Sequence, residues 1–217
     1  MHNTAMSLRS DTEHKSFSRP VSVADAMGRP LHDLRISLLD QCNLRCPYCM
    51  PEAEFHADYE FLKRQQRLTY DEILRVAAGA SSLGVSKIRL TGGEPLLDKK
   101  ICDLVERIVM LPGIDDLALT TNGMLLSLFA EKLAAAGLHR VTVSLDSIDK
   151  DIFRKMSGGR GDLEKVLAGI KAAEDAGLGP IKINVVVQKG VNDHAVLDLL
   201  EYFRGTGTIV RLIEFMD

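Results

Sequence analysis

Residues 34–50 read Leu-Arg-Ile-Ser-Leu-Leu-Asp-Gln-Cys-Asn-Leu-Arg-Cys-Pro-Tyr-Cys-Met, a short apolar segment followed directly by three cysteines. The apolar run at 34–39 is typical of a buried β-strand. Cys42, Cys46 and Cys49 then follow in a C-x3-C-x2-C spacing, which gathers three of the chain's four cysteines into eight residues. This segment therefore predicts a metal-binding loop at the end of a strand.

The cysteine loop provides three thiolates, one fewer than the four that usually hold an iron–sulfur cluster. A metal centre that keeps a ligand position open is suited to catalysis. Because the sequence shows no secretory signal, we expect these thiols to be reduced rather than joined in disulfides. A zinc site completed by His56 is the alternative. The motifs at the other strand ends, described below, make zinc the weaker interpretation.

The composition of the 217 residues, 46% hydrophobic and 26% charged, is that of a globular protein with enough chain for one core. The net charge of −3 and the aromatic content of 5% argue against nucleic acid as a partner. No apolar stretch reaches the length of a membrane span, so we expect no membrane association and a cytoplasmic location. Residues 1–27 are predicted to be a disordered leader and residues 28–217 one domain.

Short β-branched runs alternate with amphipathic helical patterns from residue 34 onward. The predicted strands are 34–39, 86–90, 115–119, 140–145, 181–187 and 208–213. The predicted helices lie near 70–83, 98–110, 125–137, 162–176 and 192–204. Thr69 is predicted to cap the first helix, and Gly84, Gly137 and Gly177 to follow the ends of three helices.

This alternation predicts an α/β fold, with a parallel sheet joined by right-handed crossovers. Six β–α units favour an incomplete (βα)6 TIM-like barrel. A doubly wound flat sheet is the competing topology, and periodicity alone does not separate the two. In both folds the active site lies at the C-terminal ends of the strands.

Polar or glycine-rich segments lie at the C-terminal ends of five predicted strands, and the fifth strand, 181–187, carries polar residues within it. In strand order they are the cysteine loop, Thr91-Gly-Gly-Glu-Pro95, Thr120-Thr-Asn-Gly123, Ser144-Leu-Asp-Ser-Ile-Asp149, the pair Lys182 and Asn184, and Glu214-Phe-Met-Asp217. Glycines such as Gly92 and Gly93 allow the backbone to approach a ligand closely. We expect their free N–H and C=O groups to bind a ligand that carries an amine and a carboxylate.

Among the cations inside predicted strands we single out Arg35, Arg89, Lys182 and Arg211. Charged side chains seldom occupy a sheet interior unless they are paired or contact a ligand. We favour a cationic cavity for an anionic substrate such as a polyphosphate. The alternative is that they form salt bridges with strand-end acids such as Asp146 or Glu214.

The motif Cys42-x3-Cys46-x-Tyr48-Cys49, together with a Gly-Gly-Glu-Pro loop after the second strand, resembles the radical S-adenosylmethionine (SAM) superfamily. Longer segments resemble one branch, the GTP 3′,8-cyclases of molybdenum cofactor biosynthesis. They are Gly28-Arg-Pro-Leu31, Asp33-Leu-Arg-Ile-Ser37, Cys49-Met-Pro51, Ile88-Arg-Leu-Thr-Gly-Gly-Glu-Pro-Leu96, Leu119-Thr-Thr-Asn-Gly123, Val143-Ser-Leu-Asp146 and Ile213-Glu-Phe-Met-Asp217. The resemblance runs from about Gly28 to Asp217.

The resemblance implies that the three cysteines hold a [4Fe–4S] cluster whose fourth iron is chelated by the amino and carboxylate groups of SAM. It implies four residues that bind SAM, namely Tyr48, Gly93, Ser144 and Met216. It implies that GTP is bound by Arg35, Arg89, Thr120 and Lys182, with Arg211 assisting.

The implied activity is that of a lyase whose cluster receives an electron from an unknown donor. The reduced cluster cleaves SAM to methionine and a 5′-deoxyadenosyl radical. That radical takes a hydrogen from the ribose C3′ of GTP, and the sugar carbon attacks C8 of guanine. The implied product is (8S)-3′,8-cyclo-7,8-dihydroguanosine 5′-triphosphate. We assign no catalytic side chain beyond the cluster ligands, because the cofactors supply the chemistry and the protein orients them and excludes water.

The chain departs from the branch in its C-terminal region. Family members hold a second cluster with a Cys-x2-Cys…Cys set and end in a Gly-Gly pair, whereas only Cys102 follows Cys49 here. We therefore expect the first cluster and SAM to bind but GTP cyclisation to be weak or absent, and exposed apolar surface to favour a homodimer. Two other functions stay open: a radical SAM enzyme acting on a peptide or protein, and a non-catalytic metal-binding relic.

Overall fold

A computed structural model describes residues 23–216. Its strands are β1 (Asp33–Ser37), β2 (Lys87–Thr91), β3 (Asp116–Thr121), β4 (Arg140–Ser144), β5 (Lys182–Val187) and β6 (Ile209–Glu214). They form one six-stranded sheet in the order β1-β2-β3-β4-β5-β6, and every neighbouring pair is parallel. A doubly wound sheet reverses its strand order at a switch point, whereas this order runs without reversal, as in a barrel. The predicted incomplete (βα)6 barrel is confirmed.

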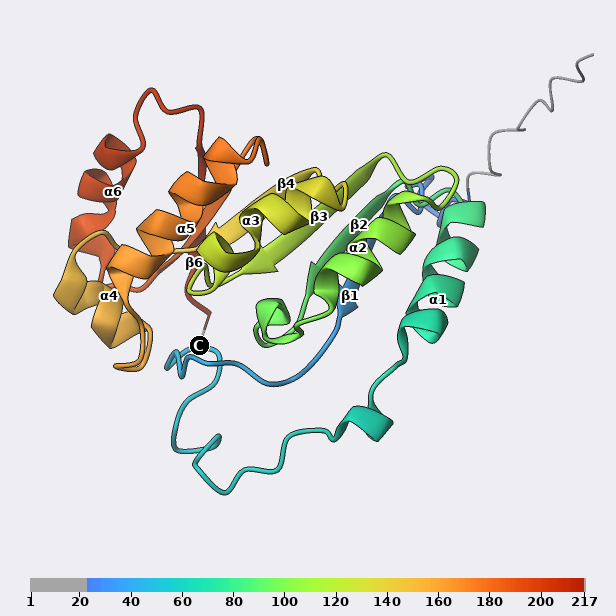
Figure 1. Cartoon of the computed structure of the whole chain (residues 1–217). Helices are drawn as coiled ribbons and strands as arrows, with labels where there is room; N and C mark the ends of the chain where they lie inside the picture. Colours follow the sequence, from blue (N-terminus) through green and yellow to red (C-terminus); the bar gives the residue numbers. More distant parts are fainter. Residues whose placement is uncertain (1–22, 217) are drawn as a thin grey trace, which may run out of the picture.

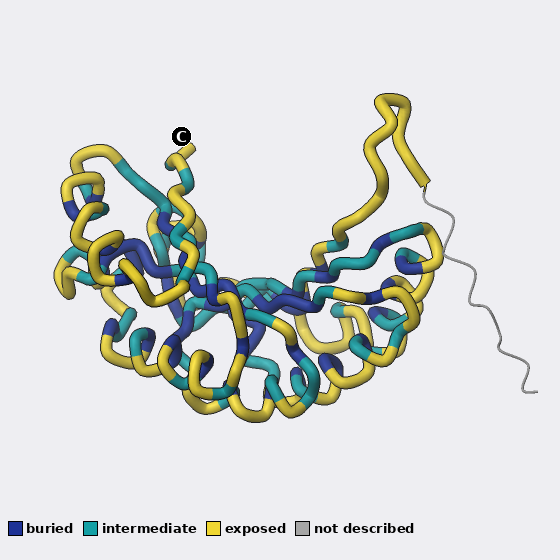
Figure 2. The backbone as a smooth tube through the Cα atoms, turned by 90° about the horizontal axis from the view of Figure 1, so that it is seen from above, coloured by how far each residue is buried: buried dark blue, intermediate teal, exposed yellow. Residues whose placement is uncertain are grey.

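Helices connect successive strands and lie along one side of the sheet (Figure 1). They are α1 (Tyr70–Ser82), α2 (Ile101–Val109), α3 (Leu126–Ala135), α4 (Lys150–Met156), α5 (Leu163–Asp175) and α6 (Val196–Tyr202). Single turns of 3-10 helix occur as η1 (Arg64–Gln66), η2 (Pro95–Leu97) and η3 (Asp193–Ala195). Seen from above, the backbone forms an open crescent with the helices on its outer side (Figure 2).

The predicted helices are confirmed, but α4 was not predicted. It has seven residues, too few to show a clear helical period. Its N-cap is Asp149, whose Oδ1 accepts hydrogen bonds from the backbone N–H groups of Asp151 and Ile152, both at 2.9 Å. Asp149, which we had grouped with the site motif after the fourth strand, therefore begins a helix.

The predicted helix ends are confirmed as well. Thr69 caps α1: its Oγ1 accepts from the N–H of Glu72 at 3.3 Å, and the Glu72 carboxylate accepts from the N–H of Thr69 at 2.8 Å. Gly84, Gly137 and Gly177 have φ values of +106°, +90° and +78°, as a left-handed residue after a helix requires.

The two faces of the sheet differ in chemistry because successive side chains of a strand point to opposite faces. The helix-facing side is apolar and fully buried over the central strands, at Ile88, Leu90, Leu117, Leu119, Val141, Val143, Ile183 and Val185. The opposite, concave face carries polar and charged side chains on every strand, and most of these are only partly buried. The helices thus close the core on one side and leave the concave face for ligands.

The N-terminal part of the described chain folds back on itself. Leu31 N–H donates to the carbonyl of Val23 at 2.8 Å, and Val23 N–H donates to the carbonyl of Leu83 at 3.2 Å. Of the predicted leader 1–27, residues 1–22 lie outside the described residues, whereas residues 23–27 belong to this turn.

Strand β6 forms one edge of the sheet and is the least covered strand, with Ile209 44% and Leu212 49% exposed. Apolar surface is therefore present at this edge, as expected, while the homodimer stays a prediction. Within residues 23–216, no helix is both long and apolar enough to cross a membrane.

Candidate functional site

The cysteine loop, residues 40–50, follows β1 and is held together by Arg45. This side chain is buried, and its Nη1 donates to the backbone carbonyls of Cys42 and Leu44, both at 2.8 Å. Its Nε donates to the carbonyl of Phe55 at 3.0 Å. Gly158 packs so closely against the same segment that a Cβ there would overlap the Arg45 carbonyl. The position of the three thiols is thus set by a buried guanidinium and a close backbone contact.

The Gly-Gly-Glu-Pro loop after β2 pairs with the start of the cysteine loop. Gly93 N–H donates to the carbonyl of Leu39 at 2.7 Å, and Glu94 N–H donates to that of Gln41 at 2.8 Å. A Cβ on Gly93 would overlap the Gln41 carbonyl. These N–H groups are therefore used inside the protein, and our expectation that they are free for a ligand is wrong. Among the described residues, no donor reaches the carbonyls of Gly92 or Gly93.

Glu94 joins this loop to the end of β3. Its fully buried carboxylate accepts from Leu96 N–H at 3.0 Å, Thr121 Oγ1 at 2.7 Å and Asn122 N–H at 2.7 Å. Burial raises the pKa of Glu94, and these hydrogen bonds oppose that rise.

Asn122 extends the connection to the thiols. Its Nδ2 donates to Asn43 Oδ1 at 2.7 Å and lies 3.7 Å from Cys42 Sγ. The Thr-Thr-Asn-Gly segment was recognised in the sequence, but a motif does not reveal that its asparagine contacts a loop 80 residues earlier.

Tyr48 connects the cysteine loop to the ends of β4 and β5. Its hydroxyl donates to Asp146 Oδ2 at 2.6 Å, and Asp146 Oδ1 accepts from Val186 N–H at 2.8 Å. Asn192, fully buried, donates from Nδ2 to the carbonyls of Asp146 at 3.0 Å and Val186 at 2.8 Å. Burial raises the pKa of Tyr48 and of Asp146. Asn192 was missed because it lies in a loop without a motif.

The three thiols lie near enough to influence one another's pKa. Burial raises the pKa of all three, and for Cys46, where Asp146, Cys42 and Cys49 add to the effect, it reaches about 12. Cys42 Sγ also accepts from Leu44 N–H at 3.4 Å, a contact that stabilises a thiolate. Thiols that influence one another in this way fit a cluster, in which each thiolate binds a different iron.

The alternative zinc site finds no support in the geometry. In the part of the chain that the structure describes, no three His, Cys, Asp or Glu side chains lie close enough to hold a single metal ion. His56 is exposed, and its Nδ1 accepts from Asp58 N–H at 3.3 Å. Cys102 packs against the hydrophobic core from α2.

The unpaired cations, a name we use for Arg35, Arg89, Lys182 and Arg211, lie on the concave face. Arg35 is in register with Arg89. Burial lowers the pKa of Arg89, and Arg35 and Arg211 lower it further; burial likewise lowers the pKa of Lys182. None of the four forms an ion pair within residues 23–216, so the alternative of salt bridges to Asp146 or Glu214 is wrong.

A second charged set, the paired group, occupies the N-terminal end of the same face. Lys87 Nζ lies 3.3 Å from Asp33 and 3.9 Å from Asp116, and Arg140 Nε donates to Asp116 at 2.7 Å. The paired group thus consists of two cations, Lys87 and Arg140, and two acids, Asp33 and Asp116, so its net charge is zero. Our sequence analysis did not single out Lys87 and Arg140, the two cations that are neutralised within the sheet.

Two buried polar atoms on the concave face have no partner among the described residues: Arg89 Nε and Asn184 Oδ1. Buried polar groups are rarely left unpaired in native proteins. Asn184 is in register with Ser144 on one side and Arg211 on the other. These two atoms are therefore available to a bound ligand or to water.

The remaining predicted residues take different positions. Thr120 is in register with Thr142, which is in register with Lys182, so Thr120 lies on the concave face. Met216 follows the end of β6 and is 85% exposed. The structure thus brings the cysteine loop, Ser144, Thr120 and the unpaired cations to one face and leaves Met216 at its margin.

Comparison with known proteins identifies the family. The radical SAM superfamily matches residues 36–203. A protein of Xanthomonas axonopodis pv. citri named GTP 3′,8-cyclase is 53% identical over 193 residues, which cover 89% of this chain and 58% of that protein. Proteins of the same name from Acidothermus cellulolyticus and Staphylococcus aureus are 51% and 45% identical, covering 90% of this chain and 54% and 57% of their own lengths. The chain spans about half the length of the curated relatives it matches.

Solved structures agree on the fold. A methylornithine synthase superposes with a TM-score of 0.67 at 17% identity, covering 85% of this chain and 53% of that one. The protein anSMEcpe with bound AdoMet also gives 0.67, at 20% identity, covering 85% and 50%. The chain therefore belongs to the radical SAM superfamily, and its cofactors are a [4Fe–4S] cluster and S-adenosylmethionine.

Proposed function

We propose that this chain performs GTP 3′,8-cyclisation, the reaction for which its relatives at 45–53% identity are named. The observation that carries the proposal is the set of unpaired cations on the concave face of the sheet. Four cations without partners, next to a charge-balanced group on the same face, favour a highly charged anion over a neutral or singly charged substrate.

The triphosphate of GTP is the part of the substrate that these cations suit. Arg35, Arg89 and Arg211 offer planar guanidinium groups that bind phosphate oxygens through two parallel hydrogen bonds. Lys182 adds a compact charge from β5, and Thr120 offers a hydroxyl from β3. Burial, and then repulsion from neighbouring cations, lowers the pKa of Arg89 and Lys182, and a bound triphosphate would offset both effects.

The cysteine loop is the part of the site that the cofactors suit. Cys42, Cys46 and Cys49 would hold the cluster, and when bound, the cluster and SAM supply the one-electron chemistry that removes a hydrogen atom from GTP. Because burial raises the pKa of all three thiols, loading of the cluster should release protons.

Tyr48, Gly93, Ser144 and Met216 are the residues we assign to SAM. Gly93 would act through its carbonyl, which accepts no hydrogen bond from the described residues and suits an amine. Ser144 ends β4 next to the unpaired Oδ1 of Asn184. Tyr48 would contact SAM with its ring, because its hydroxyl is held by Asp146.

The protein's own contribution is to orient the two ligands and exclude water. The cysteine loop, the Gly-Gly-Glu-Pro loop and the segment around Asp146 are joined by hydrogen bonds, so they present a preorganised rim. No comparable feature favours a peptide substrate, since likeness to peptide-modifying enzymes at about 20% identity extends to the fold alone.

The test is ligand binding to cluster-loaded protein. After anaerobic loading with iron and sulfide in the presence of SAM, we expect calorimetry to give a dissociation constant for GTP at least about tenfold below that for guanosine. Arg89→Met and Lys182→Met should remove this difference, whereas Lys132→Met, an exposed cation on α3, should preserve it. Equal affinity for GTP and guanosine would contradict the proposed substrate.

Product analysis tests the reaction itself. Incubation with GTP, SAM and dithionite should give 5′-deoxyadenosine together with an isomer of GTP that separates chromatographically, in low yield because the sequence predicts weak cyclisation. If 5′-deoxyadenosine forms with no coupled GTP product and GTP does not bind, a different substrate is favoured. A cluster whose electron paramagnetic resonance spectrum does not respond to SAM would instead indicate a relic.

A further inference from the structure

We propose that a cationic cavity on the outer side of the cysteine loop is the docking site for an acidic protein that delivers single electrons to the cluster. The proposal rests on the proposed function, because that chemistry consumes one electron at the cluster. It concerns a second surface, separate from the concave face that takes SAM and GTP.

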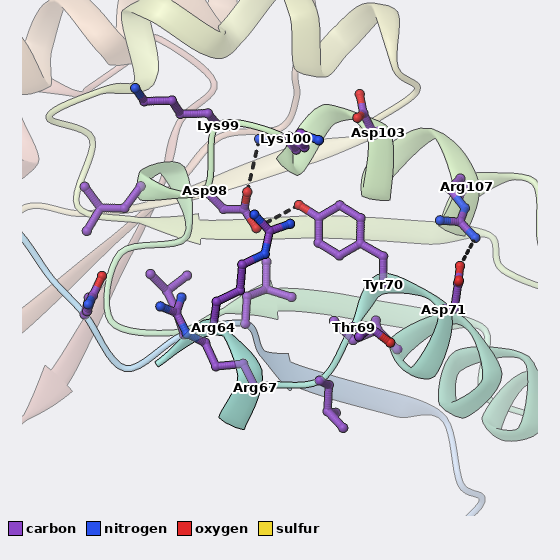
Figure 3. A pocket seen from close by; sticks show the side chains of 16 residues that line it. Arg64, Arg67, Thr69, Tyr70, Asp71, Asp98, Lys99, Lys100, Asp103 and Arg107 are labelled. Atoms are coloured by element: carbon purple, nitrogen blue, oxygen red, sulfur yellow. Dashed lines mark hydrogen bonds and ion pairs between the residues drawn. The ribbon is translucent and has the colours of Figure 1, made fainter. Parts of the chain in front are cut away.

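The cavity has a volume of about 840 Å³ and opens between η1 and the N-terminal ends of α1 and α2 (Figure 3). It is lined by Leu38, Leu39, Gln41, Arg64, Arg67, Leu68, Thr69, Tyr70, Asp71, Ile73, Leu97, Asp98, Lys99, Lys100, Asp103 and Arg107. Helices in this fold run antiparallel to the strands, so the starts of α1 and α2 lie at the same end as the cysteine loop.

The inner wall of the cavity is the segment that leads into the cluster ligands. Leu38, Leu39 and Gln41 line it, and Cys42 follows Gln41 directly in the chain. Consecutive Cα atoms are about 3.8 Å apart. A donor seated here contacts the residue that directly precedes the first cluster ligand. Since electron-transfer rates fall steeply with distance, this position is favourable for reduction.

Some charged side chains around the cavity have a partner within the protein, and others do not. Arg107 forms an ion pair with Asp71 at 2.5 Å, and Asp98 accepts from the Tyr70 hydroxyl at 2.7 Å and from Lys100 N–H at 3.0 Å. The other lining cations, Arg64, Arg67, Lys99 and Lys100, form no ion pair in the part of the chain that the structure describes. Of the three lining acids, Asp71 is ion-paired, Asp98 is hydrogen-bonded, and the Asp103 carboxylate has neither kind of contact among the described residues.

The result is a positive surface on a chain whose net charge is −3. The N-terminal ends of α1 and α2 add positive partial charge at the same place. Arg64, Lys99 and Lys100 are exposed at the rim, so they face a partner rather than a buried small molecule. Complementary charge raises the encounter rate of a protein pair.

An acidic redox protein fits this surface better than a small anion. Electron-transfer complexes are small and transient, and they depend on charge steering more than on apolar burial. The exposed rim cations and the open mouth of the cavity match that kind of contact. The concave face cannot serve this role, because SAM and GTP would occupy it during reduction.

The experiment follows reduction of the oxidised cluster in anaerobic stopped-flow, with an acidic flavodoxin in its hydroquinone form as the probe. The double variant Arg64→Glu/Lys100→Glu should lower the second-order rate constant by roughly tenfold or more at low ionic strength. It should also flatten the dependence of that rate on salt. The charge-matched control Lys132→Glu, on α3 away from the cavity, should keep the original rate.

Dithionite distinguishes this proposal from the proposed function. We expect the double variant to keep its dithionite reduction rate, its SAM-responsive cluster spectrum and its dithionite-driven product formation. An unchanged flavodoxin rate in the double variant would overturn the docking site, as would an equal loss in Lys132→Glu. Loss of the dithionite-driven properties would overturn it too, by showing that the cavity residues support the fold. Failure of GTP to bind, in contrast, affects the proposed function alone.

Discussion

The cysteine-loop end of the site and the concave floor of the sheet use charged and polar residues in opposite ways. At the cysteine-loop end, Arg45, Glu94 and Asp146 are each satisfied by hydrogen bonds from or to the protein. On the floor, Arg35, Arg89, Lys182 and Arg211 have no ion-pair partner within residues 23–216, and Arg89 Nε has no hydrogen bond. Apart from Asp40 Oδ1, which has no partner among the described residues, the first region is committed to the fold, whereas the second is left for a ligand.

This difference predicts which mutations lower stability and which weaken ligand binding. Changes at the cysteine-loop end should lower the free energy of unfolding and prevent cluster loading, because they leave buried groups unsatisfied or force backbones apart. Changes on the floor should weaken ligand binding and leave stability unchanged, because the free protein gains nothing from these charges.

The largest effect is expected for Gly93→Ala. A Cβ at this position overlaps the Gln41 carbonyl and lies 2.8 Å from that of Asp40, so the two loops must separate. We expect a loss of at least about 3 kcal/mol in the free energy of unfolding and little bound iron. Urea denaturation and an iron assay measure the two.

Gly79→Ala is the matched control for this change. Gly79 lies within α1, and a Cβ there meets nothing within 4 Å. Alanine should raise stability by about 1 kcal/mol through its higher helix propensity, with full iron content. Equal behaviour of the two variants would show that the contact between the loops is not what holds the site.

The second effect concerns Arg45→Met. Methionine fills similar space but leaves the carbonyls of Cys42, Leu44 and Phe55 without their donor, so we expect a loss of about 2–3 kcal/mol. Lys155→Met, an exposed cation on α4, should change stability by less than about 0.5 kcal/mol. If urea denaturation gives the same midpoint for both, Arg45 does not anchor the loop.

The sequence was sufficient for the alternation of strands and helices, and the count of six β–α units favoured the barrel that the structure shows. Polar motifs at the strand ends predicted the end of the sheet at which we propose that the chemistry takes place. The failures are local. The helix α4 was missed because seven residues show too little periodicity, and the N–H of Gly93 was expected to be free because a motif does not reveal what packs against it.

Pairing of charges was the other part that the sequence could not reveal. Arg89 and Lys87 are two residues apart on the same strand and face, yet Lys87 is neutralised by Asp33 and Asp116, whereas Arg89 is not. Which acid lies opposite a cation depends on strand register, which is a property of the whole sheet.

The third prediction compares Arg89→Met with Arg140→Met, two strand cations on the same face. Arg89→Met should raise the dissociation constant of GTP by roughly 10- to 100-fold with stability unchanged, because it removes a charged contact that the free protein does not use. Arg140→Met should lower stability by about 2 kcal/mol, because it leaves Asp116 with only a distant partner. Calorimetry and thermal denaturation of both variants decide the matter, and a stability loss in Arg89→Met would contradict the assignment of this arginine to the ligand.

The smallest effect is a pH dependence of GTP binding. Burial and the neighbouring Arg140 and Arg211 lower the pKa of Lys182 in the free protein, and a bound triphosphate should raise it again. Affinity should therefore be full below the lowered pKa of free Lys182 and fall as pH rises through it, with proton uptake on binding. Lys182→Arg keeps the charge but does not titrate in this range, so its affinity should stay flat over the same pH interval. Calorimetry in buffers of different ionisation enthalpy measures the proton uptake directly. A pH dependence that persists unchanged in Lys182→Arg would assign the titrating group elsewhere.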